Sequence, residues 1–218
     1  NRACELAHIL GEASLRDRLI AYPAIAQNPS LLSCEIAGRF FMDAFLAQLL
    51  EETEWERREH AAVLWQALRQ IGVNLLHLPF RFELSHRLHE ERRHGYLSVN
   101  DINKLTNTIW EDYFADTVRG SDQYVWAAKL HFYLPREPHY DWQYTAGYLI
   151  AAVLRRRLLA DGCTACGGSF GDFLSDCATI DCDELIRRHL GADPASDAFW
   201  TDAATEALNV MRDADRHI

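Results

Sequence analysis

The stretch Cys4-Glu5-Leu6-Ala7-His8 opens the chain, and Glu35 follows in the next apolar segment. An α-helix advances about 3.6 residues per turn, so Cys4 and His8 lie on one helix face, one turn apart. Glu5 lies beside this pair. Cysteine, histidine and glutamate are all residue types that coordinate transition metals. The spacing therefore predicts a helix that carries potential metal ligands close to its start.

The same five residues are similar in spacing to the helical zinc-peptidase motif H-E-x-x-H, in which two histidines bind the metal and the glutamate acts as general base. His8 and Glu5 match the second histidine and the glutamate, whereas Cys4 replaces the first histidine. Zinc also accepts thiolate and carboxylate ligands, so Cys4, His8 and Glu35 are a chemically allowed set. The alternative is an amphipathic helix without metal, in which Cys4 is a small buried apolar side chain.

The composition is typical of a soluble globular protein. Hydrophobic residues make up 49% of the 218 residues and charged residues 25%. No apolar run reaches the length of about 18 residues that a membrane span needs, and the net charge of −10 argues against nucleic acid as a partner. No secretory signal is visible at the start. Six cysteines are too few for a disulfide scaffold and predict reduced thiols in a cytoplasmic protein.

Helical periodicity covers most of the chain, whereas strand signals are nearly absent. This pattern predicts an all-α fold in a single helical domain spanning 1–218. We expect helices at about 3–18, 31–52, 53–95 with a kink at Pro79, 99–115, 140–159, 170–177, 183–190 and 197–213.

Several helix boundaries carry their own signals. Ser30, or alternatively Ser33, is expected to cap the second helix. Ser98 followed by Asp101 forms a capping-box pattern at the start of the fourth. Gly191 is a stop signal for the helix over 183–190.

Three further sequence blocks follow the opening motif. They are Glu35-Ile36-Ala37-Gly38; Phe80-Arg81-Phe82-Glu83 with His89-Glu90, Gly95, Leu97 and Ser98; and His131-Phe132-Tyr133 with Tyr140, Trp142, Tyr144 and Gly147. In this order, the four blocks resemble the C-terminal half of the catalytic domain of M3-family zinc metallopeptidases, in the oligoendopeptidase F branch. That branch carries H-E-L-G-H, E-T-A-S, R-F-E…H-E…G-x-L-S and H-F-Y…Y-x-Y-x-Y-x-x-G at the matching places. The resemblance covers nearly the whole chain.

This resemblance implies a helical, zincin-like catalytic subdomain that hydrolyses short peptides through a metal-activated water. It implies Zn²⁺ as cofactor, held by Cys4, His8 and Glu35. Glu5 would take a proton from the water and pass it to the leaving amine.

The resemblance also assigns the aromatic block to substrate binding and catalysis. His131, Tyr140 and Tyr144 would donate hydrogen bonds to the peptide backbone and to the oxyanion. Tyr140 and Tyr144 are one helical turn apart, so their hydroxyls can point the same way. We expect all three to converge on one cleft with Glu5 and His8.

Family members carry a long helical N-terminal half that forms one wall of the substrate channel, whereas the motif here stands close to the first residue. We therefore expect a fragment, a subunit completed by a second chain, or a shortened relative. Two functions remain open. One is a zinc-dependent oligopeptidase, and the other is a non-catalytic relative that binds a peptide or a partner chain through the same groove.

A cysteine-rich segment and a histidine pair are further candidate metal ligands. Cys163, Cys166, Cys177 and Cys182 resemble a four-thiolate zinc spacing, but a surface loop with incidental thiols is the preferred interpretation. Two histidines three positions apart, at 86 and 89, could share a helix face. Arginines and glutamates surround them, so the preferred interpretation is a solvated face.

Overall fold

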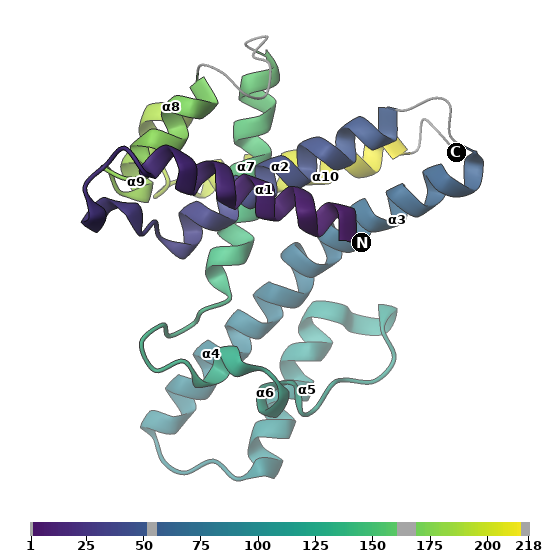
Figure 1. Cartoon of the computed structure of the whole chain (residues 1–218). Helices are drawn as coiled ribbons and strands as arrows, with labels where there is room; N and C mark the ends of the chain where they lie inside the picture. Colours follow the sequence, from purple (N-terminus) through teal and green to yellow (C-terminus); the bar gives the residue numbers. More distant parts are fainter. Residues whose placement is uncertain (1, 52–55, 161–168, 215–218) are drawn as a thin grey trace. The chain divides into compact units, whose positions relative to one another are not determined.

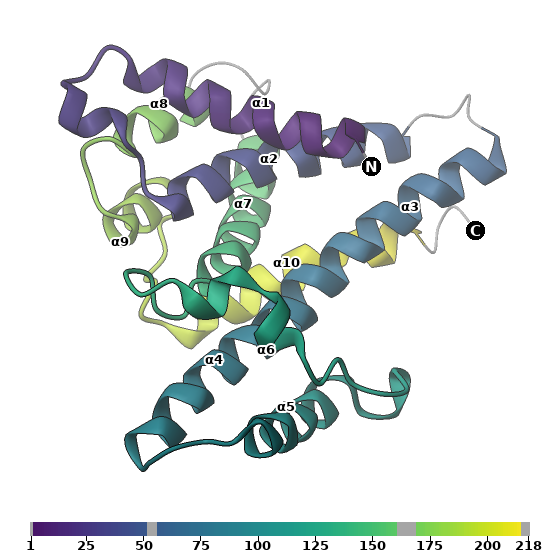
Figure 2. The ribbon, with the colours of Figure 1, turned by 60° about the horizontal axis from the view of Figure 1, so that its bottom comes forward.

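The computed structural model describes residues 2–51, 56–160 and 169–214. No strand occurs in these ranges, and the all-α fold is confirmed. The α-helices, labelled in Figures 1 and 2, are α1 (Arg2–Leu19), α2 (Leu31–Glu51), α3 (Arg57–Gly72), α4 (Leu78–Arg93), α5 (Val99–Phe114), α6 (Val125–Ala128), α7 (Trp142–Ala160), α8 (Ser169–Asp176), α9 (Cys182–Leu185) and α10 (Asp197–Ala214). Short 3₁₀ turns lie at Ala24–Gln27, Ala115–Thr117 and Leu130–Tyr133, and π-helical turns at Val73–His77 and Ile186–Leu190. Within the described ranges, no helix combines the length and the apolar character that crossing a membrane requires.

The expected helix boundaries are present. The Ser33 N–H donates to Ser30 Oγ at 3.0 Å, so Ser30 caps α2. At the start of α5, the Asp101 N–H donates to Ser98 Oγ at 3.2 Å and the Ser98 N–H donates to Asp101 Oδ2 at 3.0 Å, which completes the capping box. Gly191 ends its helix in the left-handed conformation, with φ of 59°.

The chain stays helical through Pro79, as predicted. Proline has no N–H to donate, and its ring crowds the carbonyl four residues earlier. Pro79 lies in the first turn of α4, and the turn before it, Val73–His77, is π-helical. The wider π turn relieves the crowding that proline would cause in a regular α-helix.

The chain divides into two compact units, each with its own apolar core. One unit comprises Asn1–Ile71 together with Ala146–Ile218, and the other comprises Gly72–Thr145. The candidate metal ligands of α1 and α2 belong to the first unit, and the predicted substrate-binding residues His131, Tyr140 and Tyr144 belong to the second.

In the first unit, α1 and α2 run antiparallel and side by side (Figures 1 and 2). A Cβ atom added at Gly11 would lie 2.3 Å from the carbonyl oxygen of Ala37, so only glycine allows the two backbones to come this close. The Phe40 ring of α2 stacks on Phe170 of α8, with ring centroids 4.0 Å apart. The most deeply buried side chains of the unit include Leu15, Leu19, Ile36, Ile150, Leu154, Phe173, Leu185 and Ile186. This core fixes the position of α1 against α2.

The second unit is built around Phe80 of α4, which is fully buried with Leu84, Ile109 and Val125. Trp110 and two other aromatic side chains of α5 pack edge-on against the Phe80 ring. These contacts join α4, α5 and α6 into one cluster.

Candidate functional site

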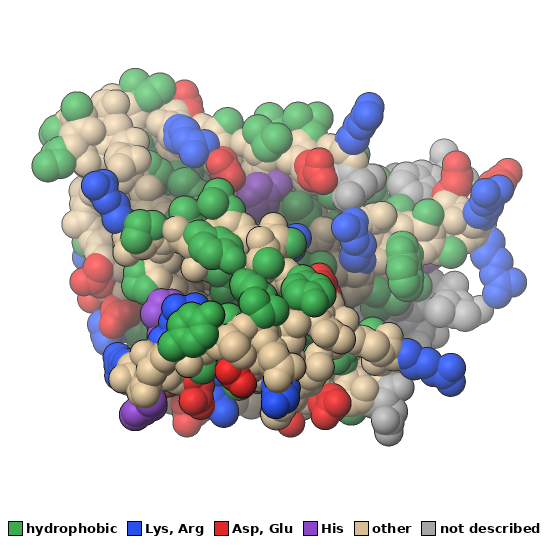
Figure 3. Space-filling view, turned by 90° about the horizontal axis from the view of Figure 1, so that it is seen from below, with side chains coloured by type: hydrophobic (Ala, Val, Ile, Leu, Met, Phe, Trp, Pro, Cys, Tyr) green, Lys and Arg blue, Asp and Glu red, His purple; other side chains and the backbone are tan. Residues whose placement is uncertain are grey.

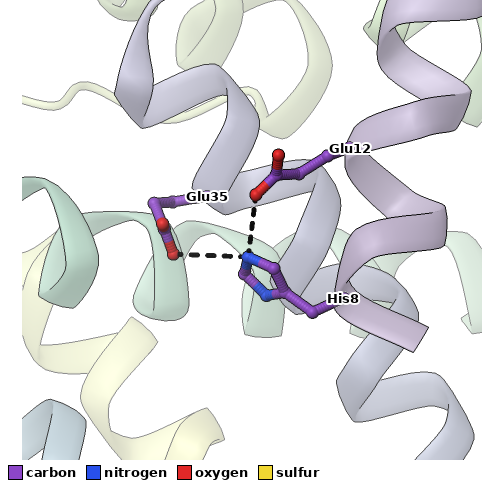
Figure 4. A group of neighbouring side chains, drawn as sticks. All are labelled: His8, Glu12 and Glu35. Carbon is purple, nitrogen blue, oxygen red and sulfur yellow. Dashed lines mark ion pairs between the residues drawn. The ribbon is translucent and has the colours of Figure 1, made fainter. Parts of the chain in front are cut away.

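Three potential metal ligands meet between α1 and α2. His8 and Glu12 lie one turn apart on α1, and Glu35 reaches toward them from α2 (Figure 4). His8 Nε2 lies 3.2 Å from Glu12 Oε1 and 3.8 Å from Glu35 Oε2. The potential ligand atoms all lie within 4.8 Å of one another. In the described part of the chain, no other group of three His, Cys, Asp or Glu side chains meets this condition.

Glu35 is the most deeply buried of the three, with 7% of its side chain exposed. Among the described residues, neither Glu35 Oε2 nor His8 Nδ1 has a hydrogen-bond partner. Burying a carboxylate oxygen without a hydrogen bond costs free energy. A divalent cation at this position would coordinate the oxygen, so the residues present fit a metal ion.

The protonation of the site follows from its burial. Burial raises the pKa of Glu35 to about 7; the charge of Arg39 opposes this rise and that of Glu12 adds to it. Burial also lowers the pKa of His8, in the same direction as Arg39, whereas Glu12 opposes the change. A neutral imidazole offers a lone pair to a cation, and the cation would in turn favour the ionised form of Glu35.

Arg39 is the nearest cation to Glu35 and compensates its charge only in part. Arg39 Nε lies 3.8 Å from Glu35 Oε2, beyond hydrogen-bond distance. Its Nη1 donates instead to Gln70 Oε1 at 2.7 Å. The same guanidinium also opposes the burial that raises the pKa of Asp43 to about 6. Because Arg39 is shared between two acids, Glu35 retains unsatisfied negative charge when ionised.

Two glycines make room for the ligands. A Cβ atom added at Gly38 of α2 would lie 2.5 Å from both Cε1 and Nε2 of His8. A Cβ atom added at Gly147 of α7 would lie 2.7 Å from Glu35 Cβ. The site therefore depends on glycines as well as on its polar residues.

Cys4, the predicted first ligand, lies away from this group. It is buried in a cluster with Met42 and Leu46, and burial raises the pKa of its thiol. Glu5, the predicted general base, is exposed on α1. Of the predicted set, the structure brings His8 and Glu35 together, and a metal-binding role for Cys4 stays a prediction.

Glu12 is the site residue that the sequence interpretation missed. It follows His8 by one helical turn, and Cys4, His8 and Glu12 share one face of α1 at spacings of four. That spacing was a usable signal. The H-E-x-x-H motif ends at its second histidine, which corresponds to His8. It therefore does not include Glu12, which follows His8 in the sequence.

The predicted substrate-binding residues form a group of their own in the second unit. His131 stacks on Tyr140 with ring centroids 4.9 Å apart, and Tyr144 lies 5.7 Å from Tyr140 by the same measure. His131 Nδ1 contacts the Arg81 guanidinium and lies 3.3 Å from Asp141 Oδ1. Arg81 and Asp141 are themselves a buried ion pair, with Nη2 and Oδ1 2.8 Å apart. The third and fourth sequence blocks thus meet in space.

Tyr140 lies in a turn rather than in the helix expected from 140, because α7 begins at Trp142. The two tyrosine rings are nevertheless neighbours. Convergence of His131, Tyr140 and Tyr144 on one cleft with Glu5 stays a prediction.

The cysteine-rich segment is only partly within the described residues, because Cys163 and Cys166 lie outside them. Cys177 and Cys182 are free thiols. Burial raises the pKa of Cys177 to about 12 and that of Cys182 to about 11, so both are protonated at neutral pH.

The pKa of Glu35 predicts how metal-free protein responds to pH. The folded-state pKa is about 7 and the ordinary value 4.5, so the folded state binds more protons between these values. Protonated Glu35 therefore contributes to the stability of the fold. We expect this contribution to be complete below pH 4.5 and lost as the pH rises through 7. A difference of about 2.5 between the two pKa values corresponds to about 3 kcal/mol of unfolding free energy.

Urea unfolding in the presence of a chelator, at pH 4.5 to 7.5, measures this dependence. Glu35→Gln should reduce it, and Asp43, whose pKa is raised to about 6, should keep its own contribution. An unchanged slope in Glu35→Gln would contradict the assignment.

Comparisons of the chain with known protein families, with curated proteins and with solved structures find no match.

Proposed function

We propose that the chain binds a divalent cation, preferably zinc, through His8, Glu12 and Glu35. We further propose that it hydrolyses short peptides as a zinc-dependent oligopeptidase. The observation that carries the proposal is the buried Glu35 oxygen, which has no hydrogen-bond partner among the described residues and faces His8. Imidazole and carboxylate are both zinc ligands, and catalytic zinc sites combine three protein ligands with one open position. A bound zinc ion would supply Lewis acidity toward water and toward a peptide carbonyl.

The other residues have roles that their positions support. Glu5 is an exposed carboxylate three positions before His8 on α1, where it can accept a proton from water and return it to a leaving amine. His131, Tyr140 and Tyr144 form a cluster of N–H and O–H donors suited to a peptide backbone. The M3-like order of the sequence blocks agrees with these roles.

A second function is binding without hydrolysis, with a peptide or a second chain as partner. The burial of Cys4 with Met42 and Leu46 favours it, because the position that resembles the first zinc-binding histidine is then part of an apolar cluster. In this function the aromatic group of the second unit would retain its binding role.

A peptide-cleavage assay with and without zinc separates the two functions. For the peptidase, we expect cleavage of short fluorogenic peptides that requires zinc and is lost in Glu5→Gln while zinc binding persists. Zinc and peptide binding without cleavage would leave only the binding function. Peptide binding without zinc would also leave only the binding function. Absence of zinc binding, peptide binding and cleavage would overturn the peptidase and leave a second chain as the only partner for the binding function.

The identity of the third ligand can be tested by a pair of variants on α1. Glu12→Gln should weaken zinc binding by about 100-fold or more, because a neutral amide replaces a charged ligand. Cys4→Ala should change the zinc affinity by less than about threefold, because the Cys4 thiol lies outside the ligand group. Isothermal titration calorimetry measures both affinities. The opposite ranking would identify Cys4 as the ligand and contradict the role of Glu12.

A further inference from the structure

A cavity of about 350 Å³ lies in the second unit, bordered by α4, α5, α6 and the turn Leu130–Tyr133. Its lining residues are Ser85, Leu88, His89, Arg92, Ile102, Trp126, Phe132 and Tyr133. This volume is at the small end of the range for ligand pockets and suits a ligand of about one amino acid. Figure 3 shows one face of the molecule, on which apolar side chains lie beside arginine, lysine and histidine side chains.

One wall of the cavity is aromatic and firmly held. The indole N–H of Trp126 donates to Asn103 Oδ1 at 3.0 Å, which fixes the ring. Trp126 and Phe132 both pack against the core of the unit, and Ile102 is buried beside them. A rigid wall of this kind binds a flat apolar group with little loss of side-chain entropy.

Arg92 gives the cavity an available positive charge. Within the described residues, its guanidinium has neither an ion pair nor a hydrogen bond, whereas the neighbouring Arg93 lies 3.1 Å from Glu90. A guanidinium without a partner is suited to a carboxylate, which it can bind through two parallel hydrogen bonds.

His89 adds an acceptor. Its Nδ1 lies 2.7 Å from the carbonyl oxygen of Ser85. A carbonyl can only accept, so Nδ1 carries the proton and donates. In the neutral ring, Nε2 is then left as an acceptor for an N–H group of a ligand.

We propose that this cavity binds an aromatic amino acid that is acylated on nitrogen and free at its carboxylate. Its ring would lie against Trp126 and Phe132, its carboxylate would pair with Arg92, and its amide N–H would donate to His89. The last residue of a peptide and a free N-acyl amino acid both present this chemistry. None of the lining residues belongs to the proposed metal site, so binding here does not depend on a cation.

The test uses the full chain with a chelator present, which keeps it independent of the proposed metal. N-acetyl-L-phenylalanine is titrated against N-acetyl-L-phenylalaninamide, its neutral counterpart, and binding is followed by NMR at the Trp126 indole signal. We expect the acid to bind at least about 10-fold more tightly than the amide, since a hydrogen bond to a charged group contributes about 1.5–3 kcal/mol. Arg92→Gln should remove this preference, and the matched control Arg93→Gln should keep it.

A tetrapeptide, Gly-Gly-Gly-Phe with a free terminus, distinguishes the two sources. Binding comparable to that of the small acid identifies a peptide end, and binding of the small acid alone identifies a free N-acyl amino acid. Equal binding of acid and amide, an acid preference that survives Arg92→Gln, or no shift at the Trp126 signal would each overturn the inference.

Discussion

Gly38→Ala is expected to weaken zinc binding by about 100-fold or more while leaving the fold intact. The new methyl group would lie 2.5 Å from Cε1 and Nε2 of His8, so the imidazole must leave the position in which it faces Glu35. A histidine ring is the mobile end of a side chain, and its movement costs the fold little. Alanine also favours a helix over glycine by about 1 kcal/mol, so the unfolding free energy should stay constant or rise.

Calorimetric zinc titration and urea unfolding of the same samples measure the two effects. Gly72→Ala is the matched control, because no described residue outside its chain neighbours and the nearby backbone of its own helix has an atom within 4 Å of the added methyl group. It should bind zinc as the unsubstituted chain does. Full zinc affinity in Gly38→Ala would show that Nε2 of His8 is not a ligand in the position described.

Gly11→Ala, unlike Gly38→Ala, should lower the unfolding free energy of the fold. Here the added methyl group would lie 2.3 Å from the Ala37 carbonyl oxygen and 2.9 Å from Gly38 Cα, both backbone atoms of α2. The two helices must separate. Overpacking of this kind costs about 3 kcal/mol, which exceeds the gain of about 1 kcal/mol in helix propensity.

The net loss for Gly11→Ala is therefore about 2 kcal/mol, or a fall of about 6 °C in the melting temperature of a chain of this size. Thermal unfolding followed by circular dichroism measures the melting temperature of Gly11→Ala, with Gly72→Ala as the control variant. An unchanged or raised melting temperature would contradict the close contact of α1 with α2.

The helices were predictable because their signals are local. Apolar spacing placed nearly all of them, and Ser30, Ser98 and Gly191 marked boundaries that hydrogen bonds in the structure confirm. The π turn before Pro79 was not predictable, because periodicity does not distinguish a single wide turn from an α-helical one. Tyr140 was placed in a helix that begins two residues later, an error typical of helix ends.

The candidate site was predictable only in part, because it depends on how two helices pack. His8 and Glu35 could be paired from the sequence blocks, and they do meet. Glu12 and Cys4 share a helix face with His8, and the sequence alone does not decide which of them lies beside Glu35. The packing of Cys4 against Met42 and Leu46 leaves Glu12 in that place.

The zinc content of the purified chain tests the central claim most directly. After dialysis against zinc and then against buffer, mass spectrometry of the metal should find about one zinc per chain, and Glu35→Gln and His8→Ala should each retain almost none. Zinc at the same level in both variants would place the ion elsewhere. Absence of zinc from the unsubstituted chain would show that His8, Glu12 and Glu35 are not a zinc site.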